Sequence, residues 1–215
     1  MNYDSKLFST RLMDRFPSGI AGLDIWQSIA RDLPRELPSF GVQKTSLRTP
    51  RLFVSYKSQD RLYATRLAYL ANQEGFEYWM DIINPTLGQA NSSSQGTTTQ
   101  KAIVVASIIE VALLNSSHVI ATITNRTAAS KWVPYEFGRV KDQTVFADVA
   151  CSWVNPVDNP PLGEYLFLCP RHRSEGSIRR WLKAERIGWE KSYRTTLRCP
   201  ASPWSGKVPP KLPGP

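Results

Sequence analysis

Short apolar runs alternate with segments of helical periodicity between residues 51 and 190. The runs have the length and the β-branched and aromatic content of strands, and the segments between them repeat apolar residues every three or four positions. We expect strands near residues 52–56, 76–80, 118–124, 144–149 and 164–169, and helices near residues 61–74, 101–115, 134–141 and 177–187. Because such alternation produces right-handed crossovers, the pattern predicts a flavodoxin-like doubly wound α/β domain with a five-stranded parallel sheet.

Two segments lie outside this alternation. Residues 1–49 contain one amphipathic stretch followed by prolines, and we interpret them as an N-terminal extension. Residues 191–215 form a basic C-terminal tail with six prolines in its last sixteen residues, which predicts an extended or disordered end that the fold does not need. The expected domain, residues 50–190, lies between them.

A polar segment separates the second expected strand from the second expected helix. Residues 82–100 are rich in Ser, Thr, Asn, Gln and Gly. Loops of this length inside a compact domain usually carry function. We therefore expect this loop to gate activity or to take part in self-association.

Composition is that of an ordinary globular protein, with 41% hydrophobic and 21% charged residues. No apolar run reaches the roughly 20 residues of a membrane span, and the first residues lack the apolar core of a signal peptide. We expect a cytoplasmic protein without a membrane partner. The three cysteines, Cys151, Cys169 and Cys199, are too widely spaced to predict a metal site or a disulfide framework.

The net charge of +9 is concentrated near the C-terminus. Residues 171–215 hold 11 Lys and Arg against 3 Asp and Glu, whereas the rest of the chain holds 16 against 15. A basic tail can contact nucleic acid or acidic lipid. A solvated surface explains it as well, and no nucleic-acid-binding motif accompanies it, so nucleic acid is not an expected partner.

Candidate chemistry centres on Glu136, which follows the third expected strand. Pro134 suits the first position of a helix, which would place Glu136 in the first turn, where free N–H groups favour a carboxylate. Trp132 lies four residues before it. In an open α/β sheet, ligands bind at the carboxyl ends of the strands, where this crossover begins. A helix-capping carboxylate and a core indole remain the structural alternatives.

Four segments in this order resemble the Toll/interleukin-1 receptor (TIR) domain family. They are Phe-Val-Ser-Tyr-Lys-Ser-Gln-Asp at 53–60, Gly-Phe-Glu-Tyr-Trp-Met-Asp at 75–81, the run at 114–124, and the Ser-x-Trp-x-x-x-Glu motif at 130–136. The resemblance covers about residues 51–190. It is closest to stand-alone bacterial TIR proteins, such as the NAD-cleaving enzymes of Thoeris antiphage systems.

The resemblance implies an activity as well as a fold. In bacterial, plant and axon-degeneration members, the glutamate of this motif is the catalytic residue of NAD cleavage. It implies release of nicotinamide and formation of a cyclic or conjugated ADP-ribose signal in antiphage defence, with NAD as substrate and no cofactor. It also implies a homo-oligomer built by TIR–TIR contacts, a downstream effector that senses the product, and a phage-derived trigger. Many animal TIR domains only bind one another, so a non-catalytic scaffold is the alternative.

The candidate residues fit cleavage of the nicotinamide–ribose bond. Nicotinamide leaves as a neutral molecule, so the reaction chiefly needs a carboxylate that stabilises an oxocarbenium-like state, and Glu136 is the candidate. The candidate substrate-binding residues are Tyr56, Lys57, Ser58, Trp79, Asp81, Ser130 and Trp132. Core packing for Trp79, and helix capping for Ser130 and Asp60, remain open. Water, an adenine nitrogen or a ribose hydroxyl could each be the attacking group.

Overall fold

The computed structural model describes residues 50–81, 98–114, 116–141, 149–198 and 208–214. The chain divides into two compact units, one of Met1–Leu47 and Asp81–Ala112, the other of Arg48–Met80 and Leu113–Pro215. The second unit contains the whole sheet. The expected extension, residues 1–49, lies outside the described residues.

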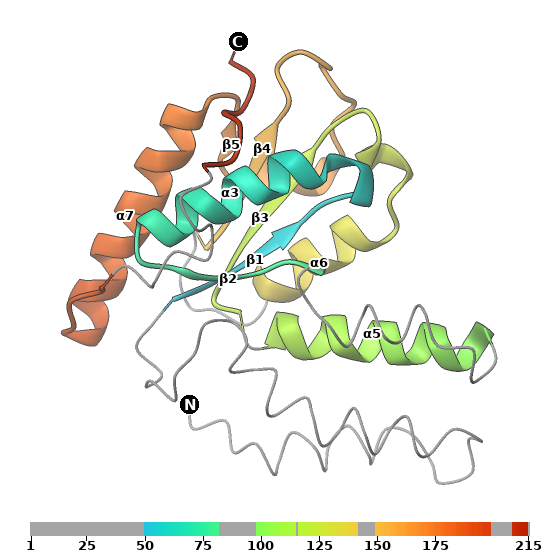
Figure 1. Cartoon of the computed structure of the whole chain (residues 1–215), viewed down its shortest axis with the longest axis horizontal. Helices are drawn as coiled ribbons and strands as arrows, with labels where there is room; N and C mark the ends of the chain where they lie inside the picture. Colours follow the sequence, from blue (N-terminus) through green and yellow to red (C-terminus); the bar gives the residue numbers. More distant parts are fainter. Residues whose placement is uncertain (1–49, 82–97, 115, 142–148, 199–207, 215) are drawn as a thin grey trace, which may run out of the picture. The chain divides into compact units, whose positions relative to one another are not determined.

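A five-stranded sheet in which every neighbouring pair is parallel forms the centre of the second unit. The strands are β1 (Arg51–Ser55), β2 (Glu77–Trp79), β3 (His118–Ile123), β4 (Ala150–Val154) and β5 (Arg171–His172), in the order β2-β1-β3-β4-β5 (Figure 1). All six residues of β3 are buried, as a central parallel strand covered on both faces requires. The predicted parallel α/β architecture is confirmed and is compatible with a flavodoxin-like fold.

Four helices lie where periodicity predicts them. They are α3 (Arg61–Gln73), α5 (Thr98–Leu114), α6 (Trp132–Lys141) and α7 (Glu175–Tyr193), with short 3-10 turns at η2 (Ser58–Asp60), η4 (Thr127–Ala129) and η5 (Glu164–Leu168). Helix α5 begins before the end of the expected loop, so residues 98–100 are helical, and residues 82–97 lie outside the described part. None of the described helices has the length and apolar character needed to cross a membrane.

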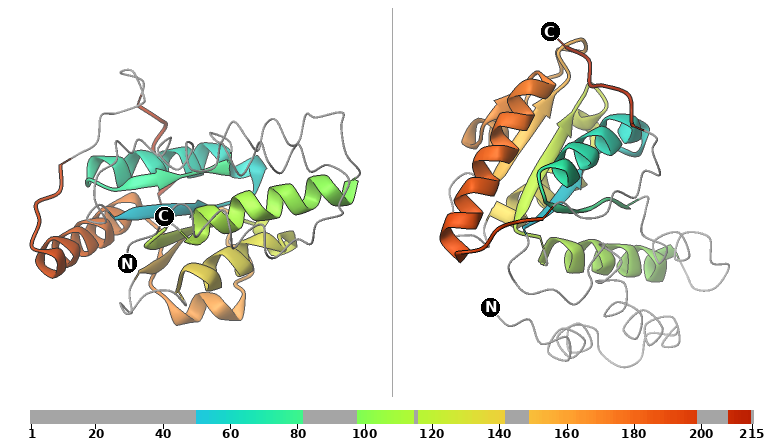
Figure 2. Two further views of the ribbon diagram at one scale, coloured as in Figure 1. Left: turned by 90° about the horizontal axis from the view of Figure 1, so that it is seen from below. Right: turned by 60° about the vertical axis from the view of Figure 1, so that its left-hand side comes forward.

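The two faces of the sheet carry different helices. Leu52 and Val54 of β1 share a buried cluster with apolar residues of α3 and α7. Because side chains alternate along a strand, Phe53 and Ser55 point to the other face, which α6 covers. Helices α3 and α6 accordingly lie on opposite sides of β1 (Figure 2, left).

The last two strands lie later in the chain than predicted. The fourth was expected at residues 144–149, but the strand is Ala150–Val154, all of it buried, and residues 142–148 are outside the described part. The fifth was expected at residues 164–169, most of which form η5 instead, with Phe167 61% and Leu168 69% exposed. The fifth prediction followed an apolar run, and an apolar run does not reveal whether it is buried. The edge strand β5 is short and polar, so it has no such signal.

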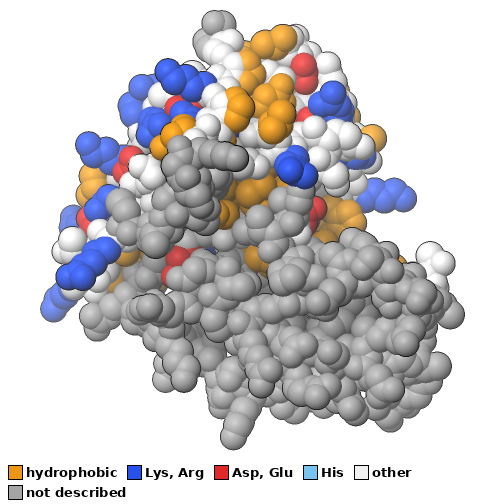
Figure 3. All heavy atoms as spheres, in the orientation of Figure 1, with side chains coloured by type: hydrophobic (Ala, Val, Ile, Leu, Met, Phe, Trp, Pro, Cys, Tyr) orange, Lys and Arg blue, Asp and Glu red, His pale blue; other side chains and the backbone are white. Residues whose placement is uncertain are grey.

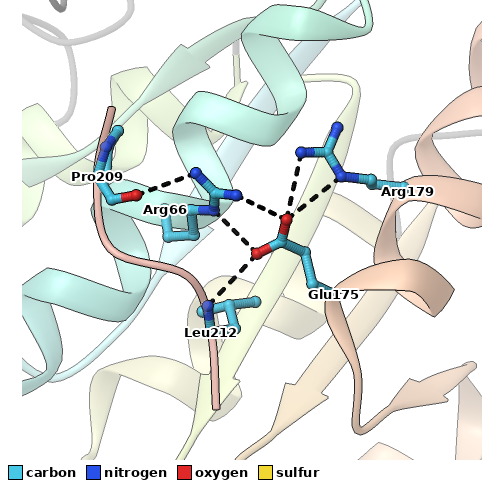
Figure 4. Close-up of polar contacts among 5 residues, drawn as sticks. All are labelled: Arg66, Glu175, Arg179, Pro209 and Leu212. Carbon is cyan, nitrogen blue, oxygen red and sulfur yellow. Dashed lines mark hydrogen bonds and ion pairs between the residues drawn. The ribbon is translucent and has the colours of Figure 1, made fainter. Parts of the chain in front are cut away.

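The proline-rich end is part of the fold. Residues 208–214 have no helix or strand, yet Leu212 is only 7% exposed and belongs to the buried cluster that also contains Leu67 and Ile178. Arg66 of α3 and Glu175 of α7 bind this segment through its main chain (Figure 4). Residues 208–214 thus lack helix and strand, as predicted, and also contribute Leu212 to the buried cluster. That the fold does not need this end stays a prediction.

Candidate functional site

Glu136 is joined to the carboxyl end of β1. The Ser55 hydroxyl donates a hydrogen bond of 2.6 Å to Glu136 Oε2, and both side chains are buried, at 0% and 7% exposure. The distance is in the range of charge-assisted O–H···O⁻ bonds. Ser55 is the last residue of β1, and Glu136 lies on α6, 81 positions later. The first and last of the four motif segments thus meet at one point of the sheet edge.

Helix α6 begins two residues earlier than predicted. Its first residue is Trp132, so Pro134 is its third residue and Glu136 its fifth. Glu136 therefore lies beyond the first turn, and the predicted contact with free N–H groups at the helix start is wrong. The Ser130 hydroxyl instead accepts the Val133 N–H at 3.3 Å, which is the capping role considered for that serine.

Trp132 is on the surface rather than in the core. Its side chain is 40% exposed, and its ring centroid lies 5.9 Å from that of Tyr135, itself 47% exposed, in an edge-on arrangement. Residues four apart lie on one face of a helix, one turn from each other. The indole is thus placed beside Glu136 along α6, with part of its surface open to solvent.

Trp79 has a packing role. It is 4% exposed and stacks on Phe53, with ring centroids 4.7 Å apart and an interplanar angle of 21°. A ring covered in this way cannot stack on a substrate base in this conformation. The alternative of core packing is therefore what the structure supports for Trp79.

The remaining candidates lie in different surroundings. Tyr56 packs against the cluster under α3 and α7, on the face of the sheet opposite Ser55. The Lys57 carbonyl accepts the Asp60 N–H at 2.7 Å and closes the turn after β1, in which Ser58 is exposed. Asp81 is half-buried and belongs to the other compact unit. The contact that defines the candidate site is the hydrogen bond between Ser55 and Glu136.

A second buried carboxylate lies after β1. Asp60 is 1% exposed and makes no capping hydrogen bond to α3, contrary to the capping alternative. It accepts hydrogen bonds from Thr124 Oγ1 at 2.7 Å and from Arg126 Nη1 at 2.8 Å. The hydrogen bond to Asp60 raises the pKa of the Arg126 guanidinium. This group ties the loop after β1 to the loop after β3, and so supports the edge that carries Ser55.

Ser55, the partner of Glu136, is not among the site residues predicted from the sequence. A signal was present, because Ser55 is a small polar residue at the carboxyl end of a buried strand, two positions after Phe53 and hence on the same face. The sequence does not give the distance between Ser55 and Glu136 on α6.

Five of the eleven Lys and Arg residues after position 170 lie on α7, and so do all three acidic residues of that stretch. Lys and Arg side chains gather on the side of the molecule where this helix lies (Figure 3). Several of the acidic side chains among them are paired, as Glu190 is with Arg186 at 3.4 Å. Within the described ranges, no three His, Cys, Asp or Glu side chains are grouped as a metal ion would require.

Comparison with known proteins finds no matching family model and no matching curated protein. Function is therefore inferred from these residues and their geometry.

Proposed function

We propose that this chain is a TIR-domain enzyme that cleaves the nicotinamide–ribose bond of NAD, with Glu136 as the catalytic carboxylate. The observation that carries the proposal is the buried hydrogen bond from Ser55 to Glu136. It joins two of the four segments behind the TIR resemblance at the carboxyl edge of a parallel sheet, where α/β proteins bind ligands. A carboxylate in this position suits a substrate that develops positive charge.

The proposed step breaks the bond between ribose C1′ and the pyridinium nitrogen. Nicotinamide leaves with the bonding electron pair and becomes neutral, while C1′ becomes oxocarbenium-like. The Glu136 carboxylate stabilises this positive charge, and the Ser55 hydroxyl holds the carboxylate in place so that little reorganisation is needed. Attack on C1′ by the acceptor, which then loses a proton, gives linear, cyclic or conjugated ADP-ribose. Glu136 is thus the catalytic residue and Ser55 a positioning residue.

Trp132 supplies a surface for the substrate. Its indole is 40% exposed and lies one helical turn from Glu136, so it can cover the ribose or stack on a ring. Lys57, in the turn after β1, is the candidate for the pyrophosphate. NAD is the substrate, and no separate cofactor takes part in this proposal.

The biological setting in this proposal is bacterial antiphage defence. The protein acts in the cytoplasm as a homo-oligomer formed by TIR–TIR contacts after a phage-derived trigger. A downstream effector then senses the ADP-ribose product.

A non-catalytic TIR–TIR scaffold is the second candidate. The exposed aromatic pair of Trp132 and Tyr135 favours it, because aromatic residues are enriched in protein interfaces. In that case the hydrogen bond between Ser55 and Glu136 only fastens α6 to the sheet. Both candidates predict self-association, and only the first predicts chemistry.

Incubating the purified full chain with NAD separates the two candidates. We expect mass spectrometry to detect free nicotinamide together with an ADP-ribose product, and the mass of the product identifies the acceptor. The control is Glu136→Gln protein at the same concentration and oligomeric state, measured by light scattering. An assembled wild-type protein, given its trigger, that releases no nicotinamide would establish the scaffold instead.

A further inference from the structure

The C-terminal segment is bound through its main chain. Arg66 Nη1 donates a hydrogen bond of 3.0 Å to the Pro209 carbonyl, and the Leu212 N–H donates one of 3.4 Å to Glu175 Oε2 (Figure 4). One carbonyl and one N–H, three residues apart, are thus recognised by a guanidinium and a carboxylate. Main-chain contacts of this kind bind an extended peptide whatever side chains it carries.

Two side chains of the segment supply specificity. Pro209 and Leu212 are buried, whereas Val208, Pro210 and Lys211 are exposed. Leu212 belongs to the cluster formed with α3 and α7. The two residues that the domain buries are thus three positions apart. The sequence read by the domain is therefore Pro-x-x-Leu.

The residues that receive the segment are also held by the body of the domain. Arg66 and Glu175 form a two-point ion pair, with Nε–Oε2 at 2.9 Å and Nη2–Oε1 at 2.7 Å. Arg179 donates to the same carboxylate at 3.2 Å, and the Arg66 guanidinium lies 5.0 Å from the Tyr69 ring centroid. We call Arg66, Glu175 and the cluster around Leu212 the tail site. Most polar contacts of the tail site are made among residues of α3 and α7. The geometry of the site is therefore set by these helices rather than by the segment that it holds.

We propose that the tail site is a peptide-binding site for short extended Pro-x-x-Leu segments, and that residues 208–214 of this chain occupy it in cis. Residues 208–214 exchange with the same segment of another molecule, the C-terminus of a second copy of this chain. A tethered segment has an effective concentration of the order of millimolar, so the cis segment fills the site unless the connection is cut.

A nicked chain tests the proposal. Residues 201–206 are replaced by a protease recognition sequence, and the folded full-length protein is then cut. A fluorescent peptide of residues 208–215 is titrated against the cut and the uncut protein, and its anisotropy is measured. We expect saturable binding to the cut protein, and binding at least about 10-fold weaker to the uncut one, because the tethered segment competes.

Unlabelled peptides provide matched controls. A Lys211→Ala peptide should compete as well as the natural sequence, since Lys211 is exposed. A Leu212→Ala peptide should compete about 30-fold less well or worse, the effect of emptying a buried leucine site. Equal competition by the Leu212→Ala peptide would overturn the proposed recognition. A cut protein that keeps its tail but never exchanges it would also overturn the proposal. So would a cut protein that loses its tail, does not bind the peptide and does not regain its fold when the peptide is added.

Discussion

Two glutamates of this domain, the buried Glu136 and the partly buried Glu175, are held in different ways. Glu136 accepts a hydrogen bond from a hydroxyl, that of Ser55 on β1, at one point of the sheet edge. Glu175 receives guanidinium groups of Arg66 and Arg179 and a main-chain N–H of the C-terminal segment. The first contact orients the Glu136 carboxylate. The second joins three segments of the chain through one carboxylate. The proposed division of roles is chemistry for Glu136 and assembly of the fold for Glu175.

Removing the guanidinium of Arg66 should have the largest effect. In Arg66→Met, Glu175 keeps Arg179 but loses its two-point partner, and we expect the free energy of unfolding to fall by about 3 kcal/mol, the low end for breaking a buried pair. Arg179→Met is the control. Because Arg179 is 41% exposed, its loss should cost under about 1 kcal/mol. Urea denaturation measures both, and equal small losses would show that the Arg66–Glu175 pair does not hold the fold.

Exchanging each glutamate for glutamine tests the division of roles. Glu136→Gln should reduce NAD turnover about 100-fold or more, since it removes the charge that stabilises the transition state. Its free energy of unfolding should change by only about 1 kcal/mol. Glu175→Gln should do the opposite, lowering stability while turnover per folded molecule is unchanged. Rates and melting curves of both variants are needed, and undiminished NAD cleavage by folded Glu136→Gln would refute the assignment.

The positioning role of Ser55 predicts a smaller effect. Ser55→Ala removes one hydroxyl from a fully buried site and should cost about 1 kcal/mol of stability. We expect kcat for NAD cleavage to fall about 10-fold, with little change in KM, because the carboxylate is less well oriented in the transition state. A rise in KM at constant kcat would instead indicate that Ser55 contacts the substrate in its ground state.

The smallest expected effect is a pH dependence that comes from Glu175. Burial alone would raise the pKa of this carboxyl, but hydrogen bonds from Arg66, from the Leu212 N–H and from Arg179 outweigh it and lower the pKa below 4.5. The ionised group therefore stabilises the fold above pH 4.5, and this contribution is lost as pH falls through the lowered value. Melting temperatures between about pH 3 and 6 should fall more steeply for wild type than for Arg66→Met. Parallel curves would show that the pair is not linked to folding.

The sequence alone determined the types and order of the central elements. Apolar runs and helical periodicity are local properties, and they correctly predicted the parallel sheet, its first three strands and all four helices. They also placed Glu136 and the turn after β1 at the same edge, because carboxyl ends of parallel strands lie together.

Only the tertiary structure decided the contacts between distant segments. The partner of Glu136 depends on how closely α6 packs on β1, and the exposure of Trp132 depends on which face of α6 meets the sheet. β5 is a short, polar edge strand whose own residues give no strand signal. It is a strand because it pairs with β4. The prolines after residue 200 predicted an end without helix or strand, but not that Arg66 and Glu175 would bind two of its main-chain groups. Periodicity describes neighbours along the chain, whereas ion pairs and packing join residues more than a hundred positions apart.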